Sequence, residues 1–180
     1  MINPYTPSFT SFELNNTQLA LHRTFLGLYA DPQQKLTVSA ICQATPLSRS
    51  SFYDYYDHIE QLKAEVEDRI VLELMQGTGP LIELDDLAFV EVTIDFVTKH
   101  REFFEAFLIK RPNPAFIDKW KQAIKYHFYP KLVISHPKTV DITLEILASA
   151  VVSTLTYLLK KPTTPLSIEE LGQLIFKVID

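Results

Sequence analysis

The chain reads LTVSAICQATPLSRSSFYDYYDHIEQL from Leu36 to Leu62, and this stretch decides the fold. Thr37 can cap a short helix over residues 38–44, and Ser48 can cap another from residue 49 to about residue 56. Hydroxyl side chains suit these positions because they accept hydrogen bonds from the free N–H groups of a first helical turn. Only a short turn separates the two helices, so the stretch predicts a helix-turn-helix.

A helix-turn-helix places its second helix in the major groove of DNA, with its N-terminal side chains at the base edges. Apolar side chains such as Ile41 and Phe52 are expected to point into a core. The alternative is an ordinary helical hairpin whose polar residues only cap the helices and face solvent. Under the first interpretation the side chains that face DNA are Ser48, Arg49, Ser50, Tyr53 and Tyr56.

The rest of the chain is also expected to be helical. Only four glycines occur in 180 residues, and apolar residues recur three and four positions apart over long stretches. With 47% hydrophobic and 22% charged residues, the chain can bury a sizeable core. We expect a helix from about residue 16 to Asp31, and another from a capping box at Asp57 and Glu60 to residue 76. Residues 130–138 are expected to form a loop, and the longest helix is expected over 140–159. The other expected helices are 85–99, 100–110, 114–129 and 167–179.

These elements predict an all-α fold, with an N-terminal three-helix module that contains the helix-turn-helix and a C-terminal helical bundle. The sequence Gly77-Thr78-Gly79-Pro80 interrupts the helical pattern and marks the domain boundary. We therefore divide the chain into a flexible arm (1–12), a helix-turn-helix DNA-binding domain with its connecting helix (13–76), and a C-terminal helical domain (81–180).

The helix-turn-helix stretch resembles the TetR family of transcriptional regulators. The resemblance implies that Thr37 and Tyr53 contact phosphates and that Arg49 and Ser50 lie near base edges. His58 and Lys63 are the nearest candidates for a further phosphate contact early in the fourth helix. The residues that carry the resemblance are Thr37, Val38, Ile41, Ala44, Ser48, Arg49, Ser50, Phe52 and Tyr53.

Two positions depart from the family pattern. The family turn usually has a glycine where this chain has Pro46, and proline cannot take a positive φ, so the turn must be built differently. The family also tends to place a lysine early in the fourth helix, where this chain has Ile59. Losing a phosphate contact lowers the affinity for DNA and flattens its salt dependence.

The C-terminal part resembles, more faintly, the branch of the TetR family that includes dihydroxyacetone-kinase operon activators. The similar segments are Phe96–Phe104, Phe107-Leu108 and Ser167–Leu171. In the family the last two long helices usually pair with their copies in a second subunit as a four-helix bundle. The resemblance implies that residues 81–180 form a ligand- or partner-sensing and dimerisation domain, with a homodimer seam along its last two helices. The alternative is that the same residues fill only the monomer core. The candidate residues are Ile142, Ile146, Ala150, Val151, Thr154, Leu158, Leu171, Leu174, Ile175 and Val178.

Basic and aromatic residues are interleaved in the middle helices. Residues 99–138 carry nine bases and three acids, whereas residues 1–76 carry five bases and nine acids. In TetR relatives this region encloses an effector pocket, so an anionic or aromatic ligand, or an acidic partner protein, is one interpretation. An aromatic core with solvated lysines is the other. The candidate pocket residues are Phe103, Phe107, Trp120 and Tyr126.

Other classes of protein find little support. The five histidines are scattered, and neither an H-E-x-x-H motif nor a phosphate-binding glycine loop occurs, so we expect no enzyme, no metal and no cofactor. Cys42 is the single cysteine, and a small buried side chain is favoured over a redox sensor. The start has no signal-peptide pattern, and no apolar run approaches the roughly 20 residues that span a bilayer. A soluble, cytoplasmic protein without membrane contact is expected.

Together these patterns predict a TetR-type regulator that binds a double-stranded DNA operator as a homodimer and responds to a small-molecule effector or a partner protein. The alternative is a TetR-like interaction subunit that binds DNA weakly or not at all and acts through a partner regulator. The net charge of −5 argues against a generic nucleic-acid coat protein, because phosphate neutralisation needs clustered Lys and Arg.

Overall fold

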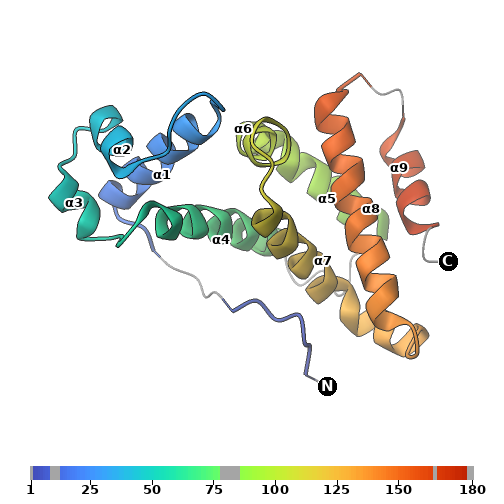
Figure 1. Cartoon of the computed structure of the whole chain (residues 1–180). Coiled ribbons are helices and arrows are strands. Elements are labelled where there is room, and N and C mark those ends of the chain that lie inside the picture. Colours follow the sequence, from blue (N-terminus) through green and yellow to red (C-terminus); the bar gives the residue numbers. More distant parts are fainter. Residues whose placement is uncertain (1, 9–12, 78–85, 164–165, 178–180) are drawn as a thin grey trace.

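The computed structural model describes residues 2–8, 13–77, 86–163 and 166–177, and every regular element in these ranges is helical (Figure 1). This confirms the all-α prediction. The helices are α1 (Asn16–Tyr29), α2 (Val38–Ala44), α3 (Arg49–Tyr53), α4 (Ile59–Gly77), α5 (Asp86–Lys99), α6 (Arg101–Glu105), the π-helix η2 (Ala106–Lys110), α7 (Pro114–Ser135), α8 (Val140–Lys160) and α9 (Ile168–Phe176).

Two capping boxes fix where α1 and α9 begin. Asn15 Oδ1 accepts from the backbone N–H of Gln18 at 3.0 Å, and Gln18 Oε1 accepts from the N–H of Asn15 at 3.3 Å. At α9, Ser167 Oγ and Glu170 Oε2 make the same exchange at 3.1 and 2.8 Å. Each box satisfies two donors that a first turn leaves free, which is why these starts could be predicted.

The predicted capping box at the start of α4 is wrong by one residue. His58 precedes the helix, and its Nδ1 accepts from the backbone N–H of Gln61 at 3.2 Å. Gln61 Oε1 in turn accepts from the N–H of Asp57 at 2.7 Å. Glu60 instead contacts Lys63, at 3.3 Å. The imidazole of His58 and the side-chain amide of Gln61 therefore replace the two carboxylates of the predicted capping box.

Helix α7 is longer than predicted, because Pro130 does not end it. With 22 residues it also exceeds α8, which has 21 and was expected to be the longest. Proline has no N–H, so the carbonyl four residues earlier loses its helical partner. That carbonyl belongs to Tyr126, and it accepts a hydrogen bond from Asn3 Nδ2 at 2.8 Å. A donor from the N-terminal segment thus replaces the missing helical bond.

Residues 2–8, which lie in the segment expected to be a flexible arm, contact α7 and α8. Tyr5 donates from its hydroxyl to Asp141 Oδ1 at 2.9 Å, and its ring meets that of Tyr129 edge-on with centroids 5.8 Å apart. The ammonium of Lys125 lies 5.5 Å from the Tyr5 ring centroid. Residues 9–12 of the predicted arm lie outside the described residues.

Helices α1, α2 and α3 form the N-terminal module, and α4 runs from it into the C-terminal domain (Figure 1). In that domain α7 packs along α8, and α9 packs on α5 and α8. The buried side chains form a continuous hydrophobic core that extends from Leu21 in α1 to Phe176 in α9. Helix α4 contributes to both ends of this core, which fixes the module relative to the rest.

Helix α8 corrects one expectation about membranes. It has 21 residues, and an 18-residue window within it has a mean hydropathy of 1.8, so by length and composition alone it could cross a bilayer. The expectation that no apolar run approaches that length is therefore wrong. A core helix of a soluble protein passes the same test. Here α8 packs against α7 and α9, and it buries Leu144, Leu147 and Leu155 between them.

Candidate nucleic-acid interface

Helices α2 and α3 have the geometry predicted for a helix-turn-helix. Thr37 Oγ1 accepts from the backbone N–H of Ala40 at 3.1 Å, and Ser48 Oγ accepts from the N–H of Ser51 at 3.0 Å. Ile41 and Phe52 are fully buried and join the core formed with α1 and α4. Both predicted caps and both inward side chains are confirmed.

The turn between the two helices is built without a positive φ. Thr45 ends α2 in an extended conformation (φ −114°, ψ 151°), which is the region that a residue before proline prefers. Its hydroxyl donates to the Ile41 carbonyl at 2.7 Å, so a last-turn carbonyl keeps a partner. Thr45 and Pro46 together replace the glycine that the family pattern uses.

The start of α3 presents polar side chains to solvent. Ser48, Arg49 and Ser50 are exposed, and so is Thr37 at the start of α2. Tyr53 is 55% exposed, while its ring rests edge-on against buried Phe52. Four of these residues lie at the N-terminal end or on the outer side of α3, where a recognition helix contacts DNA.

A hydrogen bond between the two helices positions Arg49. Its Nη2 donates to Ser39 Oγ on α2 at 3.0 Å, which leaves the remaining guanidinium donors exposed. Ser39 was not predicted as a site residue, although it lies two positions after Thr37. Tyr55 was also missed, and 37% of its side chain is exposed beside Tyr53.

Tyr56 was predicted to face DNA, and this prediction is wrong. The side chain is 1% exposed, and its hydroxyl donates to Glu65 Oε1 at 2.6 Å. Burial, followed by this hydrogen bond, raises the pKa of the phenol. His22 Nε2 lies 2.8 Å from the same carboxylate oxygen and 3.2 Å from the Tyr56 hydroxyl. Tyr56 follows Phe52 by four residues, so both point inward on the same face.

His58 directly precedes α4 and Lys63 lies in its second turn, and both have partners. Because His58 Nδ1 accepts a hydrogen bond, the ring proton of the neutral side chain is on Nε2, which is free to donate outward. Only 24% of the Lys63 side chain is exposed, and its ammonium lies 3.3 Å from Glu60 and 4.0 Å from Glu67. Lys63 is therefore already neutralised by acids of its own helix.

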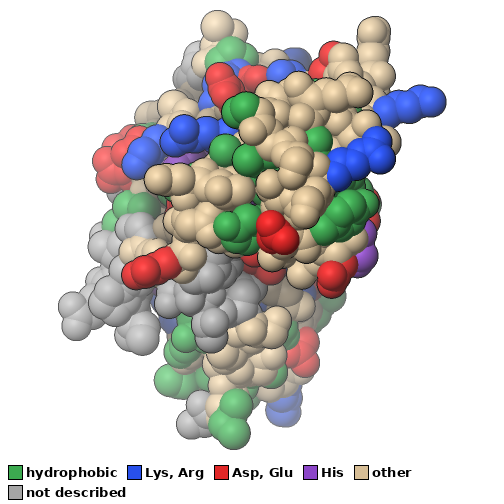
Figure 2. Space-filling model, turned by 90° about the vertical axis from the view of Figure 1, so that its left-hand side faces the viewer, with side chains coloured by type: hydrophobic (Ala, Val, Ile, Leu, Met, Phe, Trp, Pro, Cys, Tyr) green, Lys and Arg blue, Asp and Glu red, His purple; other side chains and the backbone are tan. Residues whose placement is uncertain are grey.

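The formal charge around the helix-turn-helix is balanced. Residues 35–63 carry three bases, Lys35, Arg49 and Lys63, and the three acids Asp54, Asp57 and Glu60. Phosphate contacts need clustered cations, because they draw their free energy from counterion release. Figure 2, which views the molecule from the left-hand side of Figure 1, shows acidic and basic side chains mixed on one face.

A buried carboxylate on α4 joins the module to the C-terminal domain. Glu67 is 2% exposed, and its Oε1 accepts from Asn113 Nδ2 at 2.5 Å. The ammonium of Lys119 lies 3.0 Å from Glu67 Oε2 and 2.6 Å from Asp68 Oδ1. Burial acts to lower the pKa of Lys119, but the hydrogen bonds to Asp68 and Glu67 outweigh it and leave that pKa raised. These contacts hold α4 against the start of α7.

Arg111 provides a second connection, between η2 and the loop after α1. Its Nη2 donates to the backbone carbonyls of Asp31 and Gln34, each at 2.9 Å. Tyr29 donates from its hydroxyl to the Arg111 carbonyl at 3.0 Å, and its ring stacks on Phe107 at 4.2 Å. The loop that leads into α2 is therefore held by a residue of the C-terminal domain.

Three of the four candidate pocket residues lie in an aromatic cluster of the core. Phe103 stacks on Phe107 at 4.3 Å, and Phe116 lies within 6.0 Å of both Phe107 and Trp120. These four rings are at most 5% exposed, and Trp120 Nε1 has no hydrogen-bond partner among the described residues. Tyr126 lies apart, with 37% of its side chain exposed. The four candidates therefore do not share one pocket.

Most of the basic residues in the middle helices are also occupied. Lys119 pairs with Glu67 and Asp68, while Lys121 and Lys125 both pair with Glu145. The two lysines hold the pKa of Glu145 at about 2 through their hydrogen bonds. Three of the nine bases of residues 99–138 thus form ion pairs between helices.

The candidate dimer residues differ in their exposure. Val151, Leu171 and Ile175 are buried inside the monomer, at 2 to 7% exposure, so their assignment to a subunit seam is wrong. Leu174 and Ile146 are 55% and 40% exposed, and Ile142 beside them is 58% exposed. Ala150, Thr154 and Leu158 are half-buried, and Val178 lies outside the described residues. Ile142 and Ile146 of α8 and Leu174 of α9 therefore remain uncovered large apolar side chains.

No group of three or more His, Cys, Asp or Glu side chains that could hold a metal ion occurs within the described ranges. Cys42 is half-buried, and its thiol donates weakly to the Ser48 carbonyl at 3.6 Å. The absence of an enzyme activity stays a prediction.

Solved structures with the same architecture include two transcription regulators. A TetR transcriptional regulator from Streptococcus agalactiae 2603V aligns with a TM-score of 0.72 at 19% identity, over 91% of this chain and 93% of the other. The dihydroxyacetone kinase operon activator DhaS aligns with a TM-score of 0.56 at 15% identity, over 91% and 92%. No protein-family model and no curated protein matches the sequence. The chain therefore has the fold of TetR-type transcriptional regulators, as its helix-turn-helix stretch predicted.

Proposed function

We propose that this protein is a cytoplasmic DNA-binding transcriptional regulator of the TetR type. The observation that carries the proposal is the capped start of α3, where Ser48, Arg49 and Ser50 are exposed beside Tyr53. These side chains lie on a helix-turn-helix within a TetR-like fold. Arg49 is the candidate for base contacts, and Thr37 and Tyr53 are candidates for phosphate contacts.

The regulator acts as a homodimer that pairs through α8 and α9. The large apolar side chains that these helices expose support this part of the proposal, since clusters of such side chains mark interaction surfaces. They include Ile142, Ile146 and Leu174. A dimer also supplies two recognition helices, which match the two half-sites of a palindromic operator.

Response to an effector requires that the C-terminal domain moves the helix-turn-helix. Glu67 with Lys119, and Arg111 with the carbonyls of Asp31 and Gln34, supply polar connections between the two parts. Such contacts transmit a change only when a ligand binds one arrangement better than the other. The proposal therefore assigns these residues to coupling and not to DNA contact.

A gel-shift experiment with DNA from upstream of the protein's own gene tests the proposal. Arg49→Ala should weaken binding by about 1–3 kcal/mol, as expected for a lost base contact. Tyr53→Phe should weaken it by a smaller amount that is similar across sequences, since a phosphate contact carries no sequence information. Lys177→Gln, at the exposed end of α9, is the control for a lost charge far from α3.

A second candidate function is a TetR-like subunit that acts through a partner regulator. The balanced charge of residues 35–63, and the engagement of Lys63 by Glu60, favour it. This candidate predicts no gel shift at low salt, where electrostatic binding is strongest. A shift that Arg49→Ala abolishes would instead establish autonomous DNA binding.

A further inference from the structure

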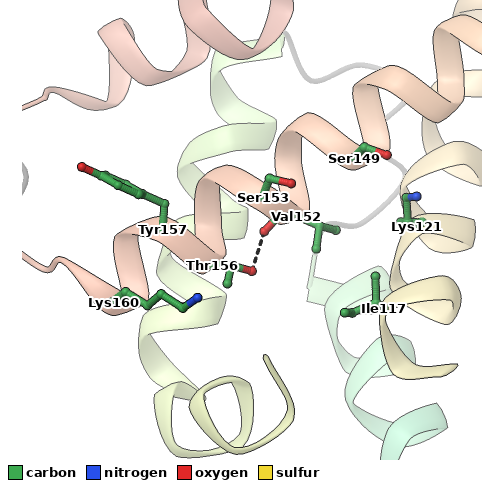
Figure 3. Close-up of a pocket in the computed structure, with 8 residues that line it drawn as sticks. All are labelled: Ile117, Lys121, Ser149, Val152, Ser153, Thr156, Tyr157 and Lys160. Atoms are coloured by element: carbon green, nitrogen blue, oxygen red, sulfur yellow. Dashed lines mark hydrogen bonds between the residues drawn. The ribbon is translucent and has the colours of Figure 1, made fainter. Parts of the chain in front are cut away.

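A groove of about 360 Å³ lies between the first turns of α7 and the last three turns of α8 (Figure 3). It shares no residue with the aromatic cluster of the core or with the helix-turn-helix. Its lining residues are Ile117 and Lys121 from α7, and Ser149, Val152, Ser153, Thr156, Tyr157 and Lys160 from α8.

Some hydrogen-bond donors that line this groove have no partner among the described residues. The ammonium of Lys160 and the hydroxyl of Ser153 have no hydrogen-bond partner within the described part of the chain. In Figure 3 the Lys160 side chain runs back along α8 toward Thr156, whereas Tyr157 points away from the other labelled residues. The Thr156 hydroxyl is already committed, because it donates to the Val152 carbonyl at 2.7 Å.

The charge of the groove is positive. Lys121 and Lys125 share one carboxylate, that of Glu145, which also accepts from Ser149 Oγ at 3.3 Å. Among the lining residues the two charged side chains, Lys121 and Lys160, are both cationic. Lys121 is only 19% exposed, so its charge is less screened by solvent than that of a surface lysine.

We propose that this groove binds a small oxyanion, a phosphate monoester or a carboxylate, and that it is the effector site of the regulator. The anion accepts from Lys160 and Ser153 and shares Lys121 with Glu145. An acceptor-rich ligand fits because ionised oxygens make the strongest hydrogen bonds to ammonium donors. Ile117 and Val152 provide the apolar wall that a carbon skeleton needs.

The position of the groove gives the anion a route to the dimer. Ser153 and Tyr157 follow Ile146 on the outward side of α8, next to the surface assigned above to dimerisation. An anion that draws Lys160 and Lys121 together changes how α7 and α8 meet at that surface. The role as an effector site rests on the proposed function, but the binding of an anion does not.

Isothermal titration of the full chain, without DNA, tests the site. The probes are inorganic phosphate, glycerol phosphate and succinate, with chloride at matched ionic strength as the reference. We expect saturable binding of at least one oxyanion, which distinguishes the phosphate and carboxylate classes. Lys160→Gln and Lys121→Gln should each weaken it about tenfold or more, as the loss of a charge-assisted hydrogen bond predicts. Lys160→Arg should retain it.

Lys35→Gln, in the loop after α1, is the charge-matched control, and thermal melts verify that each variant folds. The proposal is overturned if none of the three oxyanions binds, or if Lys35→Gln weakens binding as much as Lys160→Gln. It is also overturned if Lys160→Gln changes only the sedimentation mass, because the groove is then part of a subunit interface. A failed gel shift leaves this titration unaffected, so the two proposals fail independently.

Discussion

Substitution of Lys119 by alanine tests whether the buried Glu67 is held by a charge from another helix. The change removes an ammonium 3.0 Å from a carboxylate that is 2% exposed. Removing one partner of a fully buried ion pair costs about 3–5 kcal/mol. Here Glu67 keeps its hydrogen bond from Asn113, and 28% of the Lys119 side chain is exposed, so we expect a loss of about 1.5–3 kcal/mol.

Urea unfolding followed by far-ultraviolet circular dichroism measures this loss. With a slope of about 1–3 kcal/mol per molar urea, the midpoint should fall by roughly 1 M. Lys110→Ala removes an exposed lysine and should change the free energy of unfolding by less than about 0.5 kcal/mol. A Glu67→Gln/Lys119→Met cycle then isolates the pairwise coupling. If Lys119→Ala shifts the midpoint no more than Lys110→Ala does, the reasoning about the buried pair is refuted.

Three further predictions concern Asn3, Glu145 and Ile146. Asn3→Ala should lower the free energy of unfolding by about 0.5–1.5 kcal/mol and speed amide exchange in α7 near Tyr126; unchanged exchange would show that Pro130 needs no external donor. The pKa of Glu145 is lowered from 4.5 to about 2 by its two lysine partners, so it adds stability above pH 4.5 that is lost as the pH falls toward 2. Glu145→Gln should flatten urea midpoints over that interval, and parallel curves for the two proteins would contradict the assignment. Ile146→Glu should give a monomer mass in sedimentation if α8 forms the dimer seam, whereas a persistent dimer would place the seam elsewhere.

The local elements could be predicted because their signals lie within a few residues of one another. Thr37, Ser48 and Ser167 each cap the helix that follows them, as expected from the bonds that hydroxyls make in a first turn. The inward positions Ile41 and Phe52 follow from helical spacing in the same way. These features account for the helix-turn-helix and for the TetR-like fold.

The wrong predictions concern contacts between distant parts of the chain. Pro130 ends a helix by every local rule, and only the position of Asn3, 123 residues away from Tyr126, explains why it does not. Tyr56 carries a hydroxyl that could contact DNA, yet the side chain is buried and its hydroxyl forms hydrogen bonds with Glu65 and His22. For Tyr56 a local signal did exist, since it lies four residues after the inward Phe52.

The charged residues were the hardest to assign. Composition showed that residues 99–138 are basic, but it could not show that Lys121 and Lys125 would both meet Glu145, 20 or more positions later. Partner choice of this kind depends on how α7 and α8 pack. Lys160 lines the groove and has no hydrogen-bond or ion-pair partner within the described residues. In the sequence it has the features of an ordinary charge at a helix terminus.

The continuous core has a consequence for how this protein unfolds and for how it can be recombined. Because the ring of Tyr29 stacks on Phe107, and Leu62 and Leu74 of α4 belong to the same core, the N-terminal module leaves apolar surface uncovered when the remainder is removed. Unfolding should therefore be a single cooperative transition, with no stable intermediate that keeps only one half. A chimera that joins this N-terminal module to another C-terminal domain must bring η2 and the start of α7 with it.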